Sequence, residues 1–219
     1  MKLVIKVAMS FKFPLKFKVV FWDFDGVIKD SVRVKSDAFE LLFLPFGKKV
    51  AKKVRQHHED HGGMSRFDKL PIYLAWAGQE STQRIVDQYA DKFSQLVKQK
   101  VIGSAWVDGV KEYLQEYYHK QQFFLVTATP QLEIEYILDQ LKIKFYFQKI
   151  IGSPVNKGEA VENLLKEYHI NPIQAIMVGD SISDYEAAES NHVAFILRRT
   201  SLNEKLQQKL NCKMVKNFL

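Results

Sequence analysis

The sequence predicts an α/β fold in which a parallel sheet, covered by helices on both faces, carries an inserted all-helical segment. Short apolar runs alternate with helical patterns in most of the chain, as is typical of parallel sheets buried on both faces. Residues 34–103 break this alternation and show only helical periodicity. We therefore expect a three-layer, Rossmann-like core from residues 1–33 and 104–219, and a helical cap domain from residues 34–103.

The core elements follow from local patterns. Strands are expected at four bulky apolar runs, residues 19–22, 123–126, 175–178 and 193–197. A weaker apolar run at residues 149–151 indicates a fifth strand. Helical patterns lie between them at 109–118, 132–141, 158–168 and 185–189. The insert contains roughly four further helices and follows the first strand directly, so it is expected to lie over the strand ends.

Composition limits the function. The 219 residues suffice for one core with an inserted unit, and the single Cys212 excludes an internal disulfide and fits a cytoplasmic protein. The net charge of +7 comes with no nucleic-acid recognition motif, so we expect a solvated basic surface and no nucleic-acid partner. No apolar run approaches ~20 residues, so no membrane crossing is expected. The basic residues 1–18 are compatible with an added edge strand or with a later start at Met9.

Two acids directly after the first strand are the main chemical signal. Asp23 and Asp25 are followed by Gly26, which allows a turn that brings both carboxylates to one crevice. Because two such acids repel each other, we expect a hard cation such as Mg²⁺ between them. Such a site suits chemistry on a phosphate, whose charge the metal offsets.

Further polar residues follow the other strands. Thr127 ends the second strand, Lys157 opens a helix at its positive end, and Asp180 and Asp184 follow the strand at 175–178. Each is weak alone, because single polar residues at such positions are mostly structural. Their common placement at the carboxyl ends of strands, where open α/β sheets bind ligands, makes the set specific.

This order of motifs resembles the haloacid dehalogenase (HAD) superfamily over residues 19–197, and the insert is similar to the helical C1-type cap of its phosphoglycolate phosphatases and β-phosphoglucomutases. The resemblance implies that Asp23 is the nucleophile and that Asp25 is the general acid and base. It also implies phosphoryl binding by Thr127 and Lys157. The implied Mg²⁺ ligands are Asp23, the backbone carbonyl of Asp25 and Asp180, with Asp184 supporting the metal directly or through its shell.

The resemblance also implies where substrate is contacted. The segment that includes Ser65 and Arg66 is similar to a cap segment that faces the substrate, with Ser65 also capping the next helix and Arg66 suited to an anionic group. Gly26 and Ala128 are expected to contribute further contacts, although many relatives have Asn where Ala128 stands. The nearby residues His57, His58 and His61 are either polar helix-face residues or include one substrate contact.

The expected function is that of a Mg²⁺-dependent phosphomonoesterase acting on a small phosphorylated metabolite, of the phosphoglycolate or sugar phosphate type, through an aspartyl-phosphate. True dehalogenases of the superfamily that the chain resembles lack an acid two residues after the nucleophile, so the resemblance with Asp25 present implies a phosphate ester and not a halide. A phosphomutase of the β-phosphoglucomutase kind would use the same residues, and a non-catalytic binding protein on this fold is the alternative of another class. A monomer or a homodimer is expected.

Overall fold

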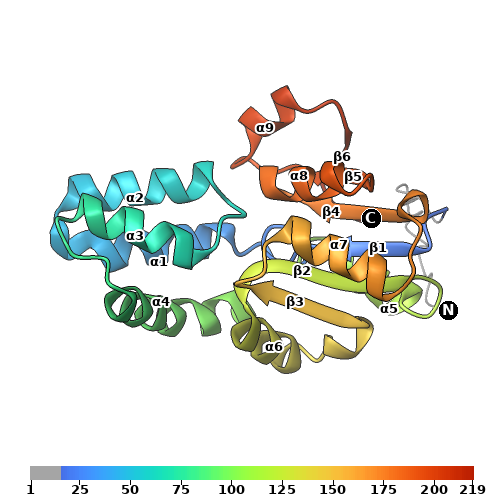
Figure 1. Ribbon diagram of the computed structural model, residues 1–219, viewed down its shortest axis with the longest axis horizontal. Helices are drawn as coiled ribbons and strands as arrows, with labels where there is room; N and C mark the ends of the chain where they lie inside the picture. Colours follow the sequence, from blue (N-terminus) through green and yellow to red (C-terminus); the bar gives the residue numbers. More distant parts are fainter. Residues whose placement is uncertain (1–15) are drawn as a thin grey trace, which may run out of the picture.

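The computed structural model describes residues 16–219 and contains one six-stranded sheet in that range. All neighbouring strands pair in parallel, in the order β3-β2-β1-β4-β5-β6 (Figure 1). The strands are β1 (Val19–Trp22), β2 (Gln122–Pro130), β3 (Lys149–Ser153), β4 (Ala175–Gly179), β5 (Ala194–Arg198) and β6 (Lys213–Val215). The five predicted strands are present, whereas β6 was not predicted because three residues are too few to show a pattern.

Helices cover both faces of the sheet, which confirms the three-layer α/β core. Alternate residues of β1 point to opposite faces, as strand geometry requires. Val20 and Trp22 pack with the apolar residues of α5 (Val110–Tyr117) and α6 (Gln131–Gln140). Val19 and Phe21 pack on the other face with those of α7 (Lys157–Glu167) and α8 (Ile182–Ser190).

Four helices occupy the insert: α1 (Val32–Phe43), α2 (Lys48–Asp60), α3 (Arg66–Trp76) and α4 (Gln83–Gly103). They lie together beyond the ends toward which the strand arrows point (Figure 1). Their shared core includes Phe39 and Phe93, whose rings stack with centroids 3.9 Å apart. The helical content of the insert is as predicted, and its position leaves the carboxyl ends of the strands facing a helical layer.

The chain after β5 adds a feature that the sequence did not reveal. The short helix α9 (Glu204–Lys209) packs near the same end of the sheet as the insert, and Lys205 pairs with Asp60 of α2 at 3.1 Å. Residues 1–15, with most of the predicted basic N-terminal segment, lie outside the described range. Within residues 16–219, no helix has the length and apolar character to cross a membrane.

Candidate active site

The predicted site residues converge where the order of the strands reverses around β1. Asp23 directly follows β1, and its backbone N–H donates to Val178 O of β4 at 3.0 Å. Thr127 lies within β2, where the pairing with β3 shifts register, and Asp180 directly follows β4. The parallel pairing of β1 with β2 and β4 thus brings three distant segments to one crevice, as expected for an open α/β sheet.

Gly26 makes room for one of the acids. Its φ of +76° is a conformation that L side chains rarely adopt. A Cβ at this position would lie 1.9 Å from Oδ2 of Asp180. Gly26 therefore shapes the turn after Asp25 and allows the Asp180 carboxylate to approach the backbone, and it does not line the cavity itself.

Three carboxylates gather around this point. Asp23, Asp180 and Asp184 each offer an oxygen, and these atoms lie within 4.8 Å of one another. Burial raises the pKa of Asp23 to about 7 against the opposing effect of Lys157, with Asp184 adding to the rise. Burial and the Asp23 charge raise the pKa of Asp180 well above its usual value. Such mutual repulsion is what a divalent cation would relieve, so the donor set fits a hard cation that prefers oxygen ligands.

Lys157 holds two of these acids in place. It is the first residue of α7, whose N-terminus is capped by Asn156. Its Nζ lies 3.0 Å from Oδ1 of Asp23 and 2.6 Å from Oδ1 of Asp184, and burial, which alone would lower its pKa, is outweighed by these two acids, which raise it. Lys157 is therefore a fixed positive charge beside Asp23.

Asp184 has both carboxylate oxygens engaged by protein groups. Oδ1 accepts from Lys157, and Oδ2 accepts from the backbone N–H and hydroxyl of Ser181 at 3.1 and 2.5 Å. Asp184 is thus both the third helical residue in a capping box of α8 and a member of the acidic group. In this arrangement the Asp184 oxygens orient Lys157 and Ser181. The carboxylate oxygens of Asp23 and Asp180 accept fewer hydrogen bonds from the described residues, so they are better placed to bind a cation.

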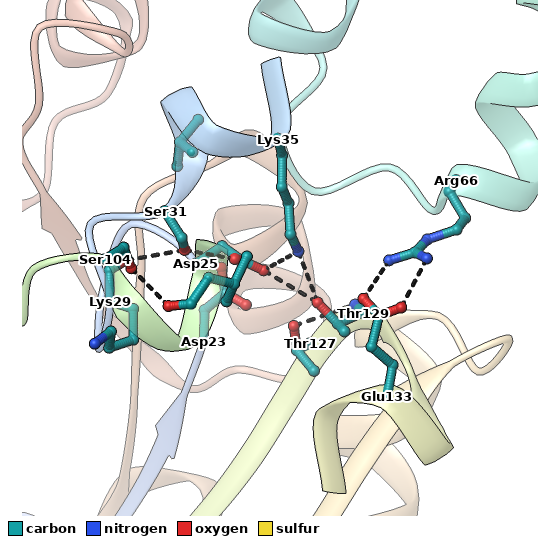
Figure 2. Close-up of polar contacts among 12 residues, drawn as sticks. Asp23, Asp25, Lys29, Ser31, Lys35, Arg66, Ser104, Thr127, Thr129 and Glu133 are labelled. Atoms are coloured by element: carbon teal, nitrogen blue, oxygen red, sulfur yellow. Dashed lines mark hydrogen bonds and ion pairs between the residues drawn. The ribbon is translucent and has the colours of Figure 1, made fainter. Parts of the chain in front are cut away.

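Asp25 is separated from the acidic group by its own hydrogen bonds (Figure 2). Its Oδ1 accepts from Ser31 Oγ at 2.6 Å, and its Oδ2 accepts from Lys35 Nζ and from Thr129 Oγ1, the latter at 3.1 Å. Burial alone would raise the pKa of Asp25, but the Lys35 ammonium and these hydrogen bonds lower it below the ordinary value. Asp25 therefore sits in its carboxylate form, paired with a cation that sequence reasoning missed.

The missed partners differ in how visible they were. Lys35 lies in the first turns of α1, close in sequence to the acidic loop, so a search for nearby cations had a chance of finding it. Thr129 lies 104 residues from Asp25, and Lys35 Nζ also donates to its hydroxyl at 2.8 Å. No local signal separates Thr129 from an ordinary strand residue.

Arg66 reaches the site from the insert but is already paired (Figure 2). Its two terminal nitrogens donate to both oxygens of Glu133 on α6, at 2.9 and 2.5 Å, and both side chains are buried. Ser94 of α4 also donates to Glu133, at 2.5 Å. Arg66 lines the cavity, and its role in binding substrate stays a prediction. Ser65 caps α3 by accepting from Phe67 N at 3.3 Å, as predicted, and does not line the cavity.

A cavity of about 430 Å³ lies between the strand ends, the insert and α9. Asp23, Asp25 and Thr127 line it from the sheet, together with Ala128, Lys157 and Asp180. Gly62 and Gly63 line it from the insert, and a Cβ on Gly63 would lie 1.7 Å from Ser183 Oγ. The loop before α3 is therefore in close contact with the N-terminus of α8, and the insert is closed over the site.

The fold and the site define a doubly wound α/β enzyme. Where the strand order reverses, it has a group of acidic residues that could bind a metal cation. The sequence matches the family model for haloacid dehalogenase-like hydrolases over residues 20–197, and the chain belongs to this family. The predicted superfamily and the prediction of an enzyme are thereby confirmed.

Individual relatives are phosphatases by name. A phosphoglycolate phosphatase of Pseudomonas savastanoi pv. phaseolicola is 27% identical, covering 82% of this chain and 68% of that protein. One of Pseudomonas fluorescens is 29% identical, covering 79% and 66%. The chain thus spans about two thirds of the length of these relatives.

Solved structures share the fold. A predicted phosphoglycolate phosphatase from Haemophilus somnus superposes with a TM-score of 0.71 at 19% identity, covering 93% of this chain and 95% of that one. CbbY from Rhodobacter sphaeroides in complex with phosphate gives 0.74 at 11% identity, covering 92% and 95%. At these identities the likeness supports the fold, including the helical insert.

Proposed function

We propose that the protein is a Mg²⁺-dependent phosphatase that hydrolyses a small phosphorylated metabolite through an aspartyl-phosphate on Asp23. The observation that carries the proposal is the arrangement at Asp23. This buried carboxylate lies 3.0 Å from Lys157, belongs to a group of three acids and lines the cavity. Family membership and the names of the relatives support the same reaction class.

In the first step, a carboxylate oxygen of Asp23 attacks phosphorus and the ester P–O bond breaks. Asp25 gives its proton to the departing alkoxide, so it must enter this step protonated. In the second step, Asp25 takes a proton from water, which attacks phosphorus, breaks the bond to Asp23 and releases phosphate. Splitting hydrolysis in this way lets one acid serve twice.

Other side chains position the phosphoryl group. Lys157 and the Thr127 hydroxyl hold its oxygens. Asp23, Asp180 and the backbone carbonyl of Asp25 would hold Mg²⁺, with Asp184 supporting the site through Lys157 and Ser181. When bound, the metal offsets charge on the phosphoryl oxygens and on Asp23.

The insert, residues 34–103 in our division, acts as a cap domain in this proposal. The cavity of about 430 Å³ accommodates a metabolite of the phosphoglycolate or sugar phosphate type, and no nucleic acid or membrane partner is required. We include a cytoplasmic location and a monomeric or homodimeric state as parts of the same proposal.

The test is Mg²⁺-dependent release of phosphate from a panel of phosphorylated metabolites, with Asp23→Asn as the variant. We expect that variant to lose all activity while keeping its fold. Release of phosphate by Asp23→Asn at the wild-type rate would overturn the nucleophile assignment. Return of the phosphoryl group to a hexose phosphate, instead of release to water, would identify a phosphomutase.

A further inference from the structure

The cavity contains a buried lysine that forms no ion pair with any carboxylate of residues 16–219. Lys69 of α3 is 1% exposed and lines the cavity. Its Nζ forms a hydrogen bond with Nδ1 of His58, at 3.0 Å, and within residues 16–219 it takes part in no ion pair. Three other buried or partly buried cations line the cavity, and each is paired with acids: Lys35 with Asp25, Lys157 with Asp23 and Asp184, and Arg66 with Glu133.

His58 of α2 offers a second unsatisfied donor. Its side chain is buried, lines the cavity and accepts the Lys69 hydrogen bond at Nδ1. Burial and the Lys69 charge hold the pKa of His58 well below its usual value, so the ring is neutral and the proton resides on Nε2. Nε2 is buried with no hydrogen-bond partner among the described residues.

Two aromatic rings lie on one side of this pair. The His58 ring packs on Phe39 with centroids 4.9 Å apart, and Phe39 stacks on Phe93. Both phenylalanines line the cavity. An ammonium in such a setting is costly unless an anion accompanies it, and an unpaired N–H beside it adds to that cost.

We propose that Lys69 and His58 form a subsite for a carboxylate at the end of the substrate remote from its phosphate, so that the substrate is the phosphate ester of a small carboxylic acid. The inference rests on the proposed function and deepens it. A carboxylate offers one oxygen to the ammonium and one to the imidazole N–H. Its single negative charge balances the single positive charge of the pair, whereas a second phosphate would bring charge in excess.

The electrostatics of Lys69 support this assignment. Burial, followed by the charge of Lys35, lowers the pKa of Lys69 to about 7. Lys157 acts in the same direction, while Asp25 and Asp68 oppose it from a distance. A bound carboxylate would raise this pKa, so binding at neutral pH would take up a proton at Lys69.

The experiment compares three phosphate esters on two variants. The esters are 2-phosphoglycolate, 2-hydroxyethyl phosphate, which replaces the carboxylate by an alcohol, and propane-1,3-diol bisphosphate, which carries a second phosphate. The variants are Lys69→Met and, as a matched control, Lys52→Met, which removes an exposed lysine of α2 that does not line the cavity. We expect the wild type to prefer 2-phosphoglycolate. Lys69→Met should lower kcat/KM for 2-phosphoglycolate by about 10- to 100-fold, the loss expected for one charge-assisted hydrogen bond. The kcat/KM for 2-hydroxyethyl phosphate should stay within about threefold of the wild-type value.

Equal loss on all esters in Lys69→Met, or no preference in the wild type, would overturn the inference. A preference for the bisphosphate that Lys69→Met abolishes would overturn the carboxylate assignment. If Lys69→Met does not fold, His58→Phe, which removes the donor at Nε2, takes its place with the same expected result.

A binding measurement separates this inference from the proposed function. Asp23→Asn protein is titrated with 2-phosphoglycolate and with the alcohol ester in Mg²⁺, with and without Lys69→Met. If binding is selective and depends on Lys69, but the wild type releases no phosphate, the subsite is supported and the proposed function fails. Phosphate release without selectivity would support the function while the subsite fails.

Discussion

Lys35 and Asp25 form a partly buried ion pair that also joins Thr129 of β2, because Lys35 Nζ donates to both side chains. The pair links the first helix of the insert to the residue that we propose as general acid and base. It lowers the pKa of Asp25, and so it favours the carboxylate that activates water over the acid that protonates the leaving group. The balance between the two proposed half-reactions thus depends on a residue outside the acidic motifs.

Replacement of Lys35 should change the pH dependence of the reaction. In Lys35→Met, burial no longer has an opposing charge, so the pKa of Asp25 rises and the acidic limb of the kcat profile moves to higher pH. We expect kcat at pH 7 to fall by about 10- to 100-fold, within the range of general acid–base effects. A pH–rate profile measures both effects. Lys35→Arg, which keeps the charge, should retain the wild-type limb, and a limb that stays in place in Lys35→Met would contradict the assignment.

Removal of the metal should make stability depend on pH. In the metal-free protein the pKa of Asp23 is about 7, above its unfolded value of about 3.9. The folded state then binds more protons between these values, so the free energy of unfolding falls as pH rises from about 4 to about 7. Mg²⁺ should therefore raise Tm more at pH 8 than at pH 5, measured against EDTA. Equal shifts at both pH values would argue against a cation at this acid group, and Asp180→Asn should reduce the shift at pH 8.

The pair of Arg66 and Glu133 should contribute to stability. Burial would raise the pKa of Glu133, and the Arg66 guanidinium lowers it. Arg66→Met removes this cation and leaves the Glu133 carboxylate buried without it. We expect a loss of about 3–5 kcal/mol in the free energy of unfolding, the usual cost of an uncompensated buried charge. Denaturant unfolding measures it. The double variant Arg66→Met with Glu133→Met should recover part of the loss, and a rise in KM beyond the stability effect would indicate that Arg66 also binds substrate.

Gly63 should matter through its contact with α8. A methyl group there meets Ser183 Oγ at 1.7 Å, so Gly63→Ala forces the loop or Ser183 to move. We expect lower kcat/KM with little change in Tm, because the contact closes the insert over the cavity. Ser183→Gly in the Gly63→Ala background removes the contacts at 1.7 and 2.8 Å and leaves Ser181 Oγ at 2.6 Å, so it should restore activity in part. Wild-type kinetics in Gly63→Ala would show that this contact is dispensable.

Much of the candidate site could be predicted because its residues follow strands. Asp23, Thr127 and Asp180 were placed together from sequence, since the carboxyl ends of parallel strands meet at one edge. Lys157 was predictable as the opening residue of a helix. The elements β6 and α9 were not predicted, because each is too short to show a periodic pattern of apolar residues.

The sequence by itself determined the order of strands and helices, the helical insert and the group of polar residues at the strand ends. These depend on local periodicity and on motifs of a few residues. Only the tertiary structure decided which charges are paired. The ion pairs of Lys35 with Asp25 and of Arg66 with Glu133, and the hydrogen bond of Lys69 with His58, depend on how α1, α2, α3 and α6 pack around one cavity. Pairing energies act over a few ångströms between residues up to 67 positions apart, and no local pattern in the chain records such distances.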